Sequence, residues 1–428
     1  MSRSILLVSY FYSPCPDTGA HRPAAMARYL RQAGHRVTVL TTRAYGELPD
    51  DEEQDVVRTA DLQLLRARLA GRDRVEPIFA GASYESKPHP LSYVLVPEPL
   101  VLAWMPFARA RALRLQRERG FDCVLTTSPP ESAHLIGRAL QRRGVPWVAD
   151  LRDGWNFEPL RTRLPTVLQR GADARLERRT LAAADVVTCV TEAMAADARE
   201  RLAARAAVVP SGFEPAAGEA APTGLLDPDR FSLVYTGRFG HYSRDPSFLL
   251  DAVAELASEQ PELARRLELV FAGPYRPEDR RLLDRDVSPV RIRVLEPLPR
   301  EQAMALQREA DALLLIASAA GGTGGALESS EPTGAARPGA GSAKLFEYLG
   351  AGPPILALAA ATEVGRIVEE CDAGLVVDAA GTAAIGTALR RLLAGEAPAG
   401  GGGREAYAYP RIAARMEEQI ERAIAKHA

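Results

Sequence analysis

The sequence predicts an α/β protein made of two Rossmann-like, doubly wound domains that face each other across a cleft. The chain has 428 residues, which is too long for a single compact core. Short apolar runs alternate with helical patterns in two consecutive series of similar length. A strand, a short helix and a second strand imply a right-handed crossover and therefore a parallel sheet.

The first series predicts an N-terminal domain over residues 1–212. An apolar run at 4–10 is followed by a loop to Gly19, a helix that stops at Gly34 and a strand at 36–41. Residues 50–92 are charged and show no clear pattern. The remaining expected elements are helices at 102–119, 132–143 and 168–183 and strands at 122–127, 145–150, 186–190 and 207–210.

The second series predicts a C-terminal domain over residues 213–404. Residues 321–341 are low in complexity and interrupt a strand-to-helix connection, which indicates a mobile loop. We expect residues 405–428 to form an amphipathic helix that packs back on the first domain. The expected strands of this domain lie at 232–236, 267–272, 292–295, 312–316, 354–358 and 375–378.

Bulk composition indicates a cytoplasmic protein. Apolar residues make up 46% and charged residues 25% of the chain, and the formal charge of -2 gives no general attraction to nucleic acid. The four cysteines are far apart and form no C-x-x-C pair, which argues against a zinc site or a disulfide framework. The apolar run at 5–12 lacks the cleavage region of a signal peptide, and no later run is long enough to span a bilayer.

In open parallel sheets, ligands bind beyond the carboxyl ends of the strands. The first loop there ends in Asp17-Thr18-Gly19 before a helix, where glycine and the helix start suit an anion. His21 and Arg22 follow in the first turn, either to reach a phosphate or acceptor or as solvated residues. The loop contains no G-x-G-x-x-G, which disfavours a dinucleotide-binding dehydrogenase.

A glycine-rich loop at 235–246 opens the second domain. It carries Arg238 and Arg244, and guanidinium groups suit two oxygens of a pyrophosphate. The alternative for Arg244 is a surface pair with the adjacent Asp245. Two arginines in one strand-to-helix loop favour phosphate binding.

A short helix with Ser342 as its expected N-cap carries Lys344 and Glu347, which share one face. Lys344 is one of only three lysines in the chain. Its ammonium suits a phosphate oxygen, and the Glu347 carboxylate suits two adjacent ribose hydroxyls. The alternative is a simple salt bridge between the two side chains.

Asp150, Arg152 and Asp153 directly follow an expected buried strand. Three charges in that position favour a functional loop over a core. The alternative is a charged cluster that only braces the loop.

These segments together resemble the family 4 retaining glycosyltransferases, which have the GT-B fold, over nearly the whole chain. Residues 146–155 fit the segment Pro-x-x-x-Asp-x-Arg-Asp-x-Trp of bacterial members, and residues 126–130 and 344–349 belong to the same resemblance. The family's first basic residue corresponds to Arg238. Its second is usually a lysine at the position of Ser243, so Arg244 or Lys344 must substitute.

The resemblance also implies two glutamates separated by seven residues. Glu347 matches the second, which binds ribose, while Gly339 stands at the position of the first and leaves the usual contact to the donor sugar unassigned. Asp150 or Asp153 would orient the acceptor hydroxyl or bind the donor sugar, and neither is a nucleophile.

The implied function is a metal-independent hexosyltransferase of polysaccharide biosynthesis that retains the anomeric configuration. Its donor is a nucleotide-diphosphate sugar, bound as a co-substrate with no further cofactor, and its acceptor is a glycan, a lipid-linked sugar or a small molecule. The expected catalytic residues are Asp150, Arg152, Asp153, Arg238 and Lys344. The expected donor-binding residues are Gly19, Arg238, Arg244, Ser342, Lys344 and Glu347.

Two other functions remain open at this point. A nucleotide-sugar epimerase of the same fold would convert the donor without an acceptor. A sugar-nucleotide-binding subunit with impaired catalysis would account for Gly339. In addition, residues 93–119 combine apolar and basic side chains, which suggests either weak peripheral membrane contact or a helix that packs into the first domain.

Overall fold

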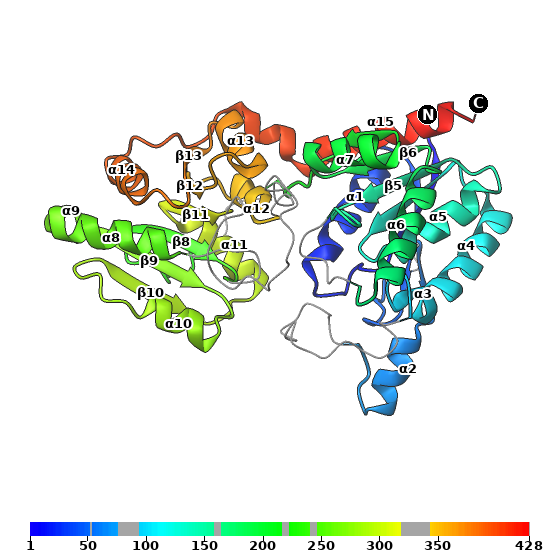
Figure 1. Ribbon diagram of the computed structural model, residues 1–428, viewed down its shortest axis with the longest axis horizontal. Helices are drawn as coiled ribbons and strands as arrows, with labels where there is room; N and C mark the ends of the chain where they lie inside the picture. The colour runs from blue at the N-terminus through cyan, green and yellow to red at the C-terminus, as the bar shows by residue number, and fades with distance from the viewer. Residues whose placement is uncertain are drawn as a thin grey trace. The chain divides into compact units, whose positions relative to one another are not determined.

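The computed structural model describes residues 1–51, 54–75, 94–157, 164–215, 222–239, 246–317 and 343–427. Contacts divide the chain into two compact units, Met1–Ser211 together with Tyr409–Ala428, and Gly212–Ala408. Each unit is built on its own parallel sheet with helices on both faces, as the ribbon in Figure 1 shows. The prediction of an α/β protein with two doubly wound sheets is therefore confirmed.

The first unit contains a seven-stranded sheet in the order β3-β2-β1-β4-β5-β6-β7 within the described residues. The order reverses between β1 and β4, and the loops after these strands open at the topological switch point. The strands are β1 (Ser4–Ser9), β2 (Arg36–Thr42), β3 (Val56–Thr59), β4 (Cys123–Ser128), β5 (Trp147–Leu151), β6 (Val186–Cys189) and β7 (Ala206–Val208).

Strand β1 explains why the sheet is covered on both sides. Leu6 and Val8 belong to the apolar cluster on one face, and Ile5 and Leu7 belong to the cluster on the other. A strand that is apolar on both faces appears in the sequence as a continuous hydrophobic run, which is typical of buried parallel strands.

Helices from distant parts of the chain cover the two faces. One face packs on α3 (Leu100–Ala103), α4 (Met105–Arg119), α5 (Ser132–Gln141), α6 (Val167–Leu181) and α7 (Glu192–Leu202). The other packs on α1 (His21–Gln32) and α15 (Tyr409–Ala425), which contact each other. The short helices η1 (Thr18–Ala20) and α2 (Leu62–Leu69) lie in connections.

The C-terminal helix α15 belongs to the first unit although the second unit precedes it in sequence. Ile412, Met416 and Ile420 are four residues apart, so they form one apolar stripe, and all three are fully buried against the sheet. The expected helix from residue 405 is a 3₁₀ helix, η3 (Gly402–Tyr407), followed by α15 from Tyr409.

The second unit has a six-stranded sheet in the order β10-β9-β8-β11-β12-β13 within the described residues. Here the switch point lies between β8 and β11. The strands are β8 (Phe231–Thr236), β9 (Leu267–Ala272), β10 (Arg291–Leu295), β11 (Ala312–Ile316), β12 (Ile355–Leu358) and β13 (Gly374–Val377).

Two helical layers enclose this second sheet. One layer contains α8 (Ser247–Glu259), α10 (Pro277–Leu283) and α14 (Thr382–Leu393), and α8 packs directly on α14. The other layer contains α11 (Arg300–Glu309), α12 (Ala343–Ala351) and α13 (Glu363–Glu370). The short helix α9 (Pro261–Ala264) follows α8.

Two expectations about the first unit need correction. The helix expected over 102–119 is divided at Trp104 into α3 and α4, because Pro106 near the start of α4 has no N–H to continue the preceding turn. The region 50–92, which showed no pattern, contains β3 and α2 in its described part. The expected loop at 321–341 lies outside the described residues.

Candidate functional site

The loop after β8 and the start of α12 come together at the switch point of the second sheet. Gly237 follows β8 with a φ of +126°, a conformation that glycine adopts readily and other residues avoid. A side chain at this position would overlap the Lys344 ammonium on α12. Glycine therefore permits the positive charge of Lys344 to lie against the loop backbone.

Aromatic rings direct the Lys344 side chain toward this loop. Its Nζ lies 4.9 Å from the ring centroid of Tyr235 and 5.7 Å from that of Tyr348, within cation–π range. The Tyr235 hydroxyl donates a 2.7 Å hydrogen bond to the Arg238 carbonyl, which fixes the loop itself. The Tyr348 hydroxyl oxygen accepts a 3.1 Å hydrogen bond from the Thr236 N–H, which ties α12 to the end of β8.

Arg238 and Glu347 lie on the same two elements as Gly237 and Lys344. Arg238 follows Gly237 directly and is half-buried. Glu347 lies one turn beyond Lys344, and its Oε1 accepts a 2.8 Å hydrogen bond from Arg300 on α11. The structure thus places the predicted residues 238, 344 and 347 on the β8–α12 side of the second sheet. The expected contributions of Arg244 and Ser342 and the position of Gly339 lie outside the described residues.

In the first unit, Asp150 at the end of β5 is buried and fully engaged. Its two oxygens accept four hydrogen bonds, two from Arg22 at 3.1 and 2.9 Å, one from Thr127 at 2.9 Å and one from Thr188 at 2.8 Å. Burial alone would raise the pKa of Asp150, but the facing Arg22 charge and the hydroxyl donors hold it below its ordinary value. The described contacts of Asp150 are therefore internal to the unit, which favours a positioning role over direct contact with a substrate.

Arg22 also differs from both alternatives considered for it. It is 4% exposed, so it is not a solvated first-turn residue, and its guanidinium is bound inside the unit. Besides Asp150, it donates to the carbonyls of Val209 and Pro210, just beyond β7. Arg22 therefore joins α1, β5 and the end of the first unit's sheet.

Arg152 braces the loops that follow three strands. Its guanidinium donates to the carbonyls of Ser128 and Pro129, each at 2.8 Å, and to that of Gly19. The Gly19 N–H, expected to bind an anion, donates instead to the Asp17 side chain at 2.7 Å. The described contacts of Arg152 therefore fit the alternative of a cluster that braces the loop.

Asp153 is different from its two charged neighbours. It is half-buried, and within the described residues its carboxylate accepts no hydrogen bond. Burial raises the pKa of Asp153, the Arg152 charge opposes this shift, and Asp17 adds to it. Of the three charges after β5, Asp153 is thus the one whose oxygens have no hydrogen-bond donor among the described residues.

The sequence reasoning missed several residues around these loops. The hydroxyls of Thr127 and Thr188 lie inside apolar strands, which is a signal for a buried polar partner such as Asp150. His134 on α5 was also not considered. Burial lowers its pKa to about 3, and its Nδ1 lies 2.8 Å from Thr126 Oγ1, so it is a neutral structural histidine.

The N-terminal part of the chain matches a known family. Residues 18–212 match the model described as the glycosyl transferase 4-like domain. No curated protein has a sequence that matches the chain.

Solved structures of the same fold cover almost the whole chain. A sucrose-phosphate synthase from Thermosynechococcus elongatus has a TM-score of 0.66 at 18% identity, covering 99% of this chain and 100% of its own. HepE from Anabaena, in complex with UDP and glucose, has a TM-score of 0.61 at 14% identity, with 98% and 99% covered. A protein described as a UDP-N-acetylglucosamine 2-epimerase of Listeria monocytogenes has a TM-score of 0.52 at 14% identity, with 100% and 98% covered.

At these identities the neighbours establish the GT-B fold alone, and it is the match of residues 18–212 to the glycosyl transferase 4-like model that supports a glycosyltransferase. Among the described helices, none is long and apolar enough to cross a membrane. Within the same residues, no group of three or more His, Cys, Asp or Glu side chains is placed to hold a metal ion.

Proposed function

We propose that the protein is a glycosyltransferase that takes a sugar from a nucleotide-diphosphate sugar and passes it to an acceptor hydroxyl. The observation that carries this proposal is the Lys344 ammonium held against the Gly237 backbone at the switch point of the second sheet. Doubly wound sheets bind nucleotides at their switch point, and the Lys344 ammonium brings a positive charge to that point. We assign the donor diphosphate as the anion that this ammonium binds.

The chemistry of donor binding follows from the side chains of this loop and helix. Lys344 supplies a compact charge for a phosphate oxygen, and Arg238 supplies a guanidinium that can bind two oxygens. Fixed positive groups stabilise the charge that develops on a departing diphosphate, the largest contribution such a site can make to the rate. Glu347, oriented by Arg300, would accept hydrogen bonds from the ribose hydroxyls.

On the acceptor side we assign the direct contact to Asp153 and a positioning role to Asp150 and Arg152. Asp153 would orient the acceptor hydroxyl, and the departing phosphate oxygen would accept the proton of that hydroxyl. We propose retention of configuration without a covalent enzyme intermediate and without a metal ion. Arg244 and Ser342 complete the proposed donor site, in which the nucleotide sugar is a co-substrate and no further cofactor takes part.

A thermal-shift panel of nucleotide sugars tests the donor assignment, because a ligand that binds only the folded protein raises its melting temperature. We expect one nucleotide sugar to raise the melting temperature of the wild type. Lys344→Ala and Glu347→Ala should lose most of this response while keeping the melting temperature of the free protein. Arg265→Ala removes an exposed arginine paired with Glu262 and is the matched control. A full response in both site variants would refute the donor site.

Product analysis separates transfer from the other two functions. With the identified donor and an acceptor extract, a glycosyltransferase forms a new glycoside and releases the nucleoside diphosphate. An epimerised nucleotide sugar formed without any acceptor would establish the epimerase instead. Donor binding with neither transfer nor hydrolysis would indicate the impaired subunit.

A further inference from the structure

Large apolar side chains that face solvent are concentrated on three segments of the first unit. Among the described residues, the only other exposed large hydrophobic side chains are Met1 and Phe248. We call the following eight residues the apolar rim: Leu62, Leu65, Leu69, Val94, Leu102, Phe107, Val167 and Leu168. They come from α2, from the segment leading through α3 into α4, and from the start of α6.

Hydrogen bonds tie these three segments to one another. Trp104 Nε1, at the junction of α3 and α4, donates to Thr59 Oγ1 at 3.0 Å, and Thr59 ends β3 just before α2. Gln169 Nε2, in the first turn of α6, donates to the Leu95 carbonyl at 3.4 Å. Figure 1 shows α2 and α3 at the same end of this unit. The three segments that carry the apolar rim are therefore neighbours in the fold.

Helix α2 presents its leucines outward from a firmly held base. Leu62, Leu65 and Leu69 are spaced three and four residues apart, so they share one face, and they are 48%, 56% and 83% exposed. Leu64 on the opposite side is buried. The N-cap Asp61 anchors the helix, because its carboxylate accepts a 2.9 Å hydrogen bond from the buried Tyr10 hydroxyl.

The same helix is strongly basic. Arg66 and Arg68 lie in its last turn and are exposed, and Arg72 and Arg74 follow within the next turn of chain. The only acidic residue from 62 to 75 is Asp73, although the whole chain has a formal charge of -2. An apolar face edged by arginines complements a surface that is apolar inside and negative at its border.

We propose that the apolar rim docks reversibly on a membrane that contains anionic lipid. The leucines of α2 enter the acyl region and the arginines bind the headgroups. A bilayer fits these residues because they project separately from three segments, and a bilayer accepts separate projections without a matching shape. The sequence pointed only to residues 93–119, whereas the structure centres the surface on α2. This inference does not depend on the proposed sugar transfer.

Vesicle co-sedimentation tests the proposal with the full chain. We expect the wild type to sediment with vesicles of mixed phosphatidylcholine and phosphatidylglycerol and to stay in solution with phosphatidylcholine alone. The triple variant Leu62→Gln, Leu65→Gln, Leu69→Gln should bind these vesicles at least about tenfold more weakly. A loss of about tenfold in affinity is what we expect when even one leucine side chain no longer enters the acyl region. Arg66→Glu with Arg68→Glu should reduce binding by more than about tenfold.

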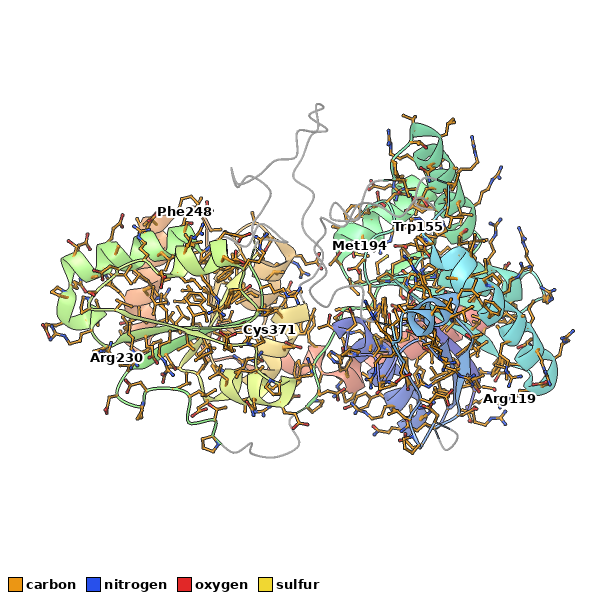
Figure 2. The ribbon with its side chains drawn as sticks, turned by 90° about the horizontal axis from the view of Figure 1, so that it is seen from below. Arg119, Trp155, Met194, Arg230, Phe248 and Cys371 are labelled. Carbon is orange, nitrogen blue, oxygen red and sulfur yellow. The ribbon has the colours of Figure 1, made fainter. Side chains whose placement is uncertain are left out.

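The matched control is Phe248→Gln, which removes an exposed aromatic side chain from α8 of the second unit (Figure 2). This variant should bind vesicles like the wild type. Equal melting temperatures in all variants show that the fold is intact. Three results would overturn the proposal: no wild-type binding to anionic vesicles, unchanged binding of the triple variant, or a dimer in light scattering that the triple variant abolishes while vesicles remain unbound.

Discussion

The buried pair of Arg22 and Asp150 gives the sharpest test of the structural reasoning. Arg22→Met keeps much of the side-chain volume but removes the charge. It leaves Asp150 as an uncompensated carboxylate that is 2% exposed, and it removes the donors to the carbonyls of Val209 and Pro210. Breaking a buried pair from one side costs about 3–5 kcal/mol of the free energy of unfolding.

Urea denaturation of four proteins measures this cost: the wild type, Arg22→Met, Asp150→Asn and the double variant. Asp150→Asn removes the charge that Arg22→Met leaves unpaired. The double variant should therefore lose less free energy of unfolding than the two single variants lose together, by more than about 0.5 kcal/mol. Additive effects, or an Arg22→Met cost below about 1 kcal/mol, would refute the account of a tightly coupled pair.

The same pair predicts a pH dependence with a definite sign. The folded pKa of Asp150 lies below its unfolded value, so the unfolded state binds more protons. Its contribution to stability is therefore fully present above the unfolded pKa of about 3.9 and is lost as the pH falls through the folded pKa. Asp150→Asn should lose less stability than the wild type over that acid range, which acid titration of the unfolding transition measures.

Two further predictions concern the reaction. Gly237→Ala places a methyl group where the Lys344 ammonium lies and at a φ of +126°, so we expect donor affinity, measured by calorimetric titration, to fall at least about tenfold. Gly171→Ala, an open position on α6, is its control. Asp153→Asn should lower kcat by about a hundredfold, as for the loss of a positioned carboxylate, with an unchanged donor response. Burial raises the pKa of Asp153, so the activity of the wild type should fall as the pH is lowered and this carboxylate is protonated. The residual activity of Asp153→Asn should not show this decrease at low pH.

The sequence predicts most strands because they are apolar runs between helical patterns. Among the described strands, β3 is the one that the sequence does not predict: Val56 and Val57 are only half-buried at the sheet edge, and no continuous apolar run marks it. The grouping of Gly237, Arg238 and Lys344 was predictable from the rule that loops gather at the carboxyl ends of parallel strands.

The roles of individual charges were less predictable. The partnership of Arg22 with Asp150 joins residues far apart in sequence and depends on β5 lying between β4 and β6, an order that no local pattern encodes. The role of Arg152 was also not predictable from the sequence, because its partners are backbone carbonyls, which have no signature in the residue types. Sequence types alone cannot separate a charge that braces loops from one that meets a ligand.

The placement of α15 bears on how the protein is made. Ile412, Met416 and Ile420 fill one side of the first sheet, yet a ribosome synthesises them only after the whole of Gly212–Ala408. Until then only α1 covers that side of the N-terminal half, whereas the second unit has all its own helices and strands and can fold first. Chains arrested before Tyr409 should therefore yield a protease-resistant second unit and a digestible first one, and protection of both would refute this order of maturation.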